Sequence, residues 1–213
     1  MLKSIYNVNT KFLVIDIETT LEGQIFDIAF AIYSRKEGII GSAGYFVKEY
    51  PKDRAYYKVS YKHRAYKKEP EPFAKIMAIM AGIIRKYNPD YATAYNSGFD
   101  FGKIAEGCNF YKIANPLENL VEVDLYHLAC QTLGKQKWFK EFVDKNKLLT
   151  PKGNRKSSAE VMYAYMILDP DFEEEHTGLG DIEIEVQILD RVIRQKKKMN
   201  LGRNKEAWKI VQG

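Results

Sequence analysis

The chain has 213 residues, of which 46 % are hydrophobic and 29 % are charged. This length and composition fit one folded globular domain and exclude a disordered chain, a collagen-like repeat and a coiled coil. The longest apolar run, residues 76–84, is shorter than the ~18 residues of a membrane helix, and the first residues show no secretory pattern. We therefore expect a cytoplasmic protein without a membrane partner.

The distribution of charge and the two cysteines bear on the class of binding partner and on disulfide and zinc sites. The net charge is +5, and residues 50–68, 135–156 and 191–205 hold 22 of the 33 lysines and arginines. Such clusters suit a polyanion such as nucleic acid, although ordinary solvated surfaces explain them equally well. Cys108 and Cys130 show neither a disulfide framework nor zinc-ligand spacing, so we expect both to be reduced core residues.

The hydrophobic periodicity predicts an α/β domain. Residues 11–17 are apolar on both faces and β-branched, as in a strand buried on both sides. An antiparallel meander opens the domain, parallel strands follow, and helices cover the resulting mixed sheet. In chain order we expect strands at 11–17, 25–33, 39–48, 91–95 and 120–123, and helices at 73–87, about 99–107, 125–133, 138–146, 158–168 and 179–197.

Two helix starts and two basic segments complete the predicted organisation. Asp124 is expected to be a helix N-cap, and Ser157 with Glu160 has the spacing of a capping box. We expect a single domain over residues 1–213 with a basic tyrosine- and lysine-rich insertion at about 50–71 and a basic C-terminal tail at about 196–213. The tyrosines of the insertion could stack on bases while its cations hold phosphates, or the segment could be a solvated loop on the domain edge.

The strongest chemical signal is a set of acidic residues. Asp16 and Glu18 stand at the end of the first buried strand, two residues apart, so both side chains project from the same face of the sheet. Two carboxylates in one buried place cost several kcal/mol per unpaired ion unless cations or hydrogen bonds neutralise them. Asp100 opens a helix directly after another strand, where open α/β sheets collect their ligands. A capped loop or a helix dipole contact would explain each acid taken alone.

Asp181 and His176 add to this set near the last helix. Asp181 begins a helical face that continues through apolar residues, so it is expected to point toward the core. His176 precedes it by five residues, roughly 140° around a helix, so we expect the histidine to lie on the loop before the helix. Histidine side chains titrate near pH ~6.5 and can take a proton from water. The glutamates near the last helix are expected to be solvated charges: Glu173, Glu174, Glu175 and Glu185. The other two histidines, His63 and His127, are expected to have surface or packing roles.

The motifs resemble those of the DEDDh family of 3′→5′ exonucleases, the superfamily of the bacterial proofreading exonuclease subunit, on a ribonuclease H-like fold. The resemblance extends from about residue 11 to residue 195. It rests on DIETT at 16–20, NSGFD at 96–100 and HTGLGD at 176–181, in the family's order. Leu21 stands where a glycine is frequent in the family, and Tyr95 stands where many members have a histidine.

The resemblance implies an enzyme that hydrolyses phosphodiester bonds at the 3′ end of DNA and releases nucleoside 5′-monophosphates. Two divalent ions, Mg²⁺ or Mn²⁺, would support the reaction, and His176 would act as general base. A polymerase or another replication protein is the partner that the resemblance suggests. The implied cation ligands are Asp16, Glu18, Asp100 and Asp181, and the implied substrate contacts are Thr19, Thr20, Asn96 and Phe99.

Two alternatives remain open on the sequence. An RNA-trimming enzyme of the same superfamily would use the same chemistry; Thr19, in place of the methionine common in oligoribonucleases, favours DNA. A catalytically silent nucleic-acid-binding or polymerase-associated scaffold is the alternative from another class, and the complete acidic set argues against it.

Overall fold

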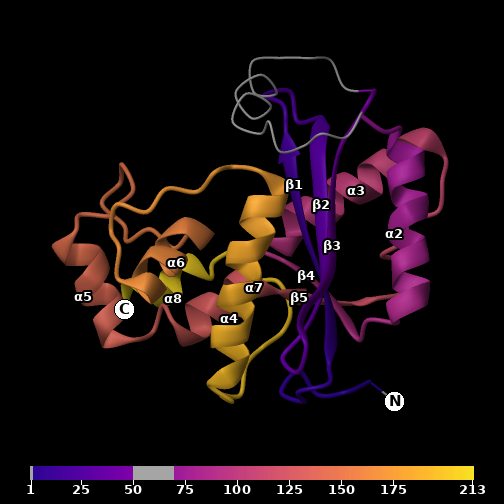
Figure 1. The fold of residues 1–213 in the computed structure, drawn as a ribbon. Helices are drawn as coiled ribbons and strands as arrows, with labels where there is room; N and C mark the ends of the chain where they lie inside the picture. Colours follow the sequence, from indigo (N-terminus) through magenta and orange to yellow (C-terminus); the bar gives the residue numbers. More distant parts are fainter. Residues whose placement is uncertain (1, 50–69) are drawn as a thin grey trace.

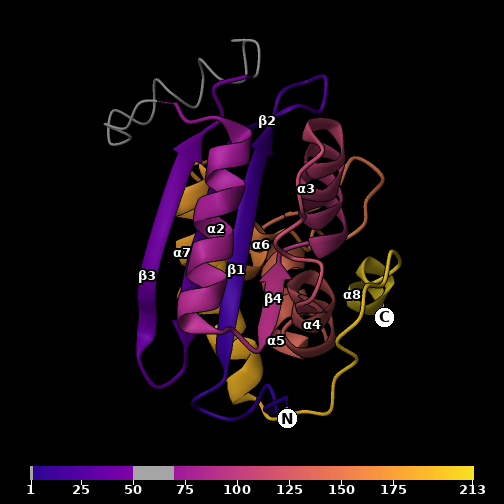
Figure 2. The same cartoon turned by 90° about the vertical axis from the view of Figure 1, so that its right-hand side faces the viewer.

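The computed structural model describes residues 2–49 and 70–213, which build a five-stranded mixed sheet with helices on both faces (Figures 1 and 2). The strand order is β3-β2-β1-β4-β5; β1, β2 and β3 form an antiparallel meander, and β4 and β5 run parallel to β1. The predicted order of strands and helices is confirmed. The strands are β1 (Lys11–Thr19), β2 (Ile25–Ser34), β3 (Gly38–Phe46), β4 (Tyr91–Ala94) and β5 (Val121–Asp124).

The helices form two layers, one on each face of the sheet. In Figure 2 α2 and α3 lie in front of the sheet, and α7 crosses behind β1 and β2. Figure 1 shows the second layer, with α4, α5, α6 and α8 on the same side as α7. The bounds are α2 (Phe73–Tyr87), α3 (Ser97–Tyr111), α4 (Leu125–Thr132), α5 (Lys137–Lys145), α6 (Ala159–Ile167), α7 (Gly178–Arg194) and α8 (Trp208–Gln212).

Strand β1 is covered on both faces, as its sequence predicts. Leu13 and Ile15 belong to the apolar cluster under α2 and α3, whereas Phe12 and Val14 belong to the cluster under α4 and α7. Because strand side chains alternate between faces, Asp16 and Glu18 continue the row of Phe12 and Val14. Both carboxylates therefore lie on the α7 face of the sheet.

Two predicted helix starts differ in the structure. Helix α3 begins at Ser97, two residues earlier than expected, because within the turn at 96–98 only Asn96 takes the left-handed conformation (φ 74°) and the chain is helical directly after it. Helix α6 is capped by Ser158, whose Oγ accepts the N–H of Val161, and the capping box predicted at Ser157 is wrong by one residue. The hydroxyl of Ser157 instead bonds that of Tyr126.

The C-terminal segment packs against the domain instead of extending from it as a tail. The carbonyl of Leu201 accepts the N–H of Asp124 (3.0 Å), and that of Gly202 lies 2.6 Å from Nδ1 of buried His127. Helix α8, which the sequence analysis did not predict, packs on α4. His127 therefore has a packing role, since it joins α4 to this segment.

The cysteine prediction is confirmed, because Cys108 and Cys130 are free and buried. Within residues 2–49 and 70–213, no helix combines the length and the apolar character that a membrane crossing requires. The predicted insertion falls almost entirely on residues outside the described ones, as do its basic window and His63.

Candidate active site

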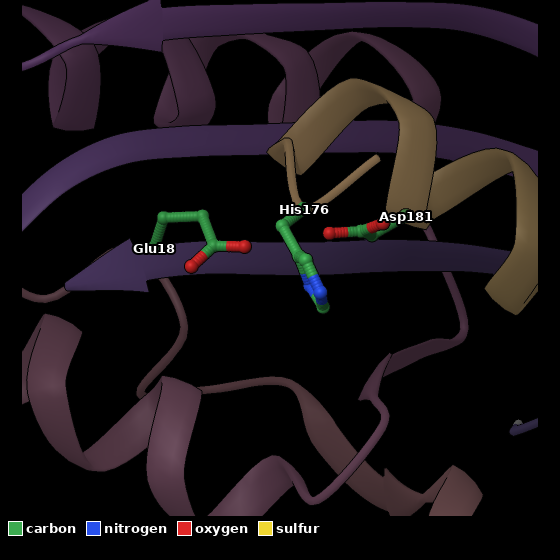
Figure 3. Close-up of side chains that lie close together, drawn as sticks. All are labelled: Glu18, His176 and Asp181. Carbon is green, nitrogen blue, oxygen red and sulfur yellow. The ribbon is translucent and has the colours of Figure 1, made fainter. Parts of the chain in front are cut away.

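The three sequence motifs meet at the carboxyl end of β1. Figure 3 shows Glu18 on β1 beside His176 and Asp181, which lie at the start of α7. One candidate ligand atom from each of these three residues lies within 4.8 Å of the other two. Asp100, in the first turn of α3, lies beside the same end of β1, because its Oδ1 accepts the N–H of Ile17 at 3.3 Å. Segments far apart in the sequence thus place their acidic residues in one small volume.

The start of α7 is held by contacts to its own loop and to β2. Thr177 is the N-cap, and its Oγ1 accepts the N–H of Gly180 at 3.2 Å. The N–H of Gly178 donates to Oδ2 of Asp27 on β2, also at 3.2 Å. His176 precedes the cap with a left-handed backbone (φ 54°). As predicted, the histidine lies on the loop, outside the helical repeat that carries Asp181.

Replacing Gly178 with alanine is expected to disturb the site through packing alone. A Cβ at this position would lie 2.7 Å from the Cβ of Ala29, a distance that forces α7 away from β2. Overpacking of this kind costs about 1–3 kcal/mol, and here it would displace His176 and Asp181. We expect Gly178→Ala to lower the melting temperature and to weaken Mn²⁺ binding measured by titration calorimetry.

Gly102→Ala is the matched control for this substitution. Gly102 lies in α3, and no described atom comes within 4 Å of a Cβ built there. Alanine is favoured over glycine in a helix by about 1 kcal/mol, so this variant should be as stable as the parent or more stable. Equal melting temperatures and Mn²⁺ affinities for Gly178→Ala and the parent would contradict this prediction, because they would show that the contact between α7 and β2 accommodates a methyl group.

Burial and mutual repulsion raise the pKa of these carboxyl groups. Burial raises the pKa of Asp100 to about 8, although N–H groups that bond the carboxylate oppose the shift. Burial, reinforced by the charges of Glu174 and Glu18, also raises the pKa of Asp181 to about 8. The pKa of Asp16 is raised by burial first and then by its acidic neighbours. Each ionised acid of this cluster therefore destabilises the ionised form of its acidic neighbours.

Several carboxylate oxygens in this volume are buried without a donor. Oδ2 of Asp16, Oδ1 of Asp181 and Oε2 of Glu185 have no hydrogen-bond partner among residues 2–49 and 70–213. A buried acceptor without a partner is costly, and oxygen ligands from carboxylates are those that Mg²⁺ and Mn²⁺ prefer. The residues present therefore fit a divalent cation, which would give these oxygens the positive charge that residues 2–49 and 70–213 do not provide.

Glu185 is a member of this cluster that the sequence analysis misassigned. The prediction that it is solvated is wrong: it is 3 % exposed, and its Oε1 accepts the N–H of Tyr95 at 3.1 Å. Glu185 lies four residues after Asp181, so both project from the same side of α7. The periodicity that placed Asp181 toward the core also applies to Glu185 and could have identified it.

The other glutamates before α7 divide into two kinds. Glu173 and Glu175 are exposed, as predicted. The solvated interpretation of Glu174 is wrong, because its side chain is only 13 % exposed and burial with nearby acids raises its pKa to about 7. Its Oε2 lies 4.0 Å from Nδ1 of His176. A partly buried carboxyl group therefore lies next to the imidazole.

The predicted substrate contacts lie around the same edge of the sheet. Thr19 is half-buried at a bulge that ends β1, and the hydroxyl of buried Thr20 accepts the N–H of Gln24 in the following turn. Asn96 lines a cavity of about 650 Å³ together with Tyr95 and Gly98. The side chain of Phe99 is 44 % exposed at the first turn of α3.

The arrangement of sheet and helices is similar to that of a solved DEDDh exonuclease domain, and this likeness confirms the predicted ribonuclease H-like α/β fold. The chain is similar to the nuclease domain of 3'hExo, a DEDDh family member whose crystal structure holds bound rAMP. The likeness covers 91 % of this chain and 96 % of that one, with a TM-score of 0.61 and 12 % sequence identity. No protein-family model matches the sequence, and no curated protein is significantly similar to it.

Proposed function

We propose that the protein is a metal-dependent 3′→5′ exonuclease that removes nucleoside 5′-monophosphates from single-stranded or frayed 3′ ends. The observation that carries the proposal is the group of buried, donor-free carboxylate oxygens beside His176. A scaffold that only binds nucleic acid has no need of this group, because buried unpaired acids reduce stability. The DEDDh exonuclease fold supports the same conclusion.

Each residue of the cluster has a role in the proposed reaction. Asp16, Glu18, Asp100 and Asp181 would hold two divalent cations. When bound, such cations would lower the pKa of a water molecule and stabilise the negative charge that develops on the phosphate. His176, whose side chain is 54 % exposed, would accept the proton of the attacking water. Glu174, 4.0 Å away, would stabilise the imidazolium that results.

The bond that breaks joins the phosphorus to the 3′-oxygen of the penultimate nucleotide. Water supplies the oxygen of the new P–O bond, and the phosphate leaves with the terminal nucleotide as a 5′-monophosphate. The shortened chain retains a 3′-hydroxyl. The half-exposed ring of Phe99 and the edge formed by Thr19 are suited to contact the terminal base and sugar.

DNA and RNA are the two candidate substrates. The threonine at position 19 favours DNA, as argued from the sequence. The rAMP bound to the domain of similar fold favours the alternative, a 3′→5′ exoribonuclease. We propose DNA as the preferred substrate, and a polymerase or another replication protein as a partner.

The experiment that tests the proposal follows matched DNA and RNA oligonucleotides labelled at the 5′ end. With Mg²⁺ or Mn²⁺ we expect a ladder of products that shorten from the 3′ end, and chelation with EDTA should stop it. An oligonucleotide with a phosphorothioate at its last 3′ linkage should be degraded more slowly, whereas the same block at the 5′ end should have no effect. Full-length DNA and RNA after incubation would contradict the exonuclease proposal, and faster RNA degradation would contradict the preference for DNA.

A further inference from the structure

Glu185 is a buried acid that none of the motif positions includes. It lies on α7 one turn after Asp181 and is 3 % exposed. Its Oε1 accepts the N–H of Tyr95 at the end of β4, and this bond connects α7 to the edge of the sheet where the site lies. Its Oε2 is buried and has no hydrogen-bond partner in the described part of the chain.

The surroundings of Glu185 are acidic. After burial, the charge of Glu185 raises the pKa of Asp16, and burial and the charges of Asp100 and Asp181 in turn raise the pKa of Glu185. An apolar residue at this position would pack between α7 and β4 without the cost of a buried charge. A positive charge in the space that these acids share would offset the cost of burying the carboxylate of Glu185.

We propose that Glu185 is a fifth acidic residue of a divalent-cation site at the carboxyl end of β1, where it increases the affinity for ions such as Mg²⁺ and Mn²⁺. The inference rests on the proposed function, since it concerns the same cation site. Glu185 adds a negative charge on the side of the site that faces α7 and β4. The low dielectric around buried groups makes such a charge effective.

The test compares Mn²⁺ binding to the purified full chain and to Glu185→Gln by isothermal titration calorimetry after removal of metal with EDTA. Glutamine has nearly the same shape, and its carbonyl oxygen can still accept the N–H of Tyr95. The charge alone is therefore removed. We expect Glu185→Gln to bind Mn²⁺ at least about tenfold more weakly, as expected for a unit charge near a divalent ion at partly buried positions.

Two further variants distinguish charge from packing. Glu183→Gln is the matched control, since this exposed acid lies on α7 between Asp181 and Glu185 and should bind Mn²⁺ like the parent. Glu185→Asp keeps the charge on a shorter side chain and should bind Mn²⁺ more tightly than Glu185→Gln. A purely structural role would give the opposite order, because glutamine preserves the packing better than aspartate.

The outcomes separate this inference from the proposed function. Two results would overturn the role of Glu185: the parental Mn²⁺ affinity in Glu185→Gln, or weaker Mn²⁺ binding by Glu185→Asp than by Glu185→Gln. The proposed function would stand in either case, provided that the parent binds Mn²⁺ and degrades DNA. A parent chain that bound no Mn²⁺ would overturn the cation site itself and the proposed function with it.

Discussion

Replacing Asp16 with asparagine is expected to reduce the rate of nucleotide release by at least about 10³-fold. Asp16 lies on the central strand, and its charge interacts with Glu18, Asp100, Asp181 and Glu185. Loss of one group that stabilises transition-state charge in a water-excluded site costs about 10²–10³ in rate. Asp16 would in addition hold the cations, so its removal affects both ions. The measurement is the initial rate on 5′-labelled single-stranded DNA with Mg²⁺.

Glu22→Gln is the control for this variant, because Glu22 is an exposed acid in the turn that follows β1. It should leave the rate within about twofold of the parent, as expected for a surface substitution. Asp16→Asn should still bind DNA in the presence of EDTA, since the basic surfaces remain. Parental activity in Asp16→Asn would contradict the assignment, and trace activity equal in both preparations would indicate a contaminating nuclease. A parent that binds DNA without cleaving it would favour the scaffold alternative.

Without metal, the protein is expected to become less stable as the pH rises from about 6 to about 8. The carboxyl groups of Asp100 and Asp181 have pKa values of about 8 in the folded protein, against ~3.9 for aspartate in an unfolded chain. Below pH ~4 both states hold these protons. Between ~4 and about 8 only the folded state does, so unfolding releases protons and rising pH favours it. Between pH 6 and pH 8 the lost free energy of unfolding is about 2–5 kcal/mol.

Thermal unfolding of the EDTA-treated protein at pH 6, 7 and 8 measures this effect. A loss of this size should lower the melting temperature by about 5 °C or more in a chain of this length. Saturating Mn²⁺ should remove or reverse the trend, because cations bind the ionised carboxylates and stabilise the folded state more at higher pH. Asp181→Asn should flatten the metal-free dependence. A melting temperature of the metal-free parent that rises from pH 6 to pH 8 would contradict the conclusion that these carboxyl groups are buried close together.

Local sequence patterns were sufficient for most of the secondary structure. The doubly apolar segment at 11–17 predicted a strand covered on both faces, and β1 lies between the clusters under α2 and α7. The helix predicted at 73–87 has the same bounds as α2. The position of His176 on a loop followed from the angle of five residues around a helix. These predictions succeed because side-chain periodicity depends only on the backbone repeat.

Predictions failed where packing between distant segments decides the outcome. Helix α8 has a short and weak pattern, and contacts with α4 hold it in place. Ser157 and Ser158 are both able to cap a helix, and the contact of Ser157 with Tyr126 leaves the cap to its neighbour. Glu185 was assigned to solvent because glutamate is rarely buried, yet it is 3 % exposed and accepts the N–H of Tyr95, which follows β4.

The sequence by itself determined which residues we propose to carry the chemistry: they fall in three short motifs in a fixed order, each at the end of a strand or the start of a helix. Only the tertiary structure decided that Glu18, His176 and Asp181 lie within 4.8 Å of one another and that Glu185 joins their cluster. The physical reason is that periodicity assigns a side chain to a face, whereas the distance between faces depends on how helices pack on the sheet. At Gly178 that packing brings α7 so close to β2 that a single methyl group would not fit.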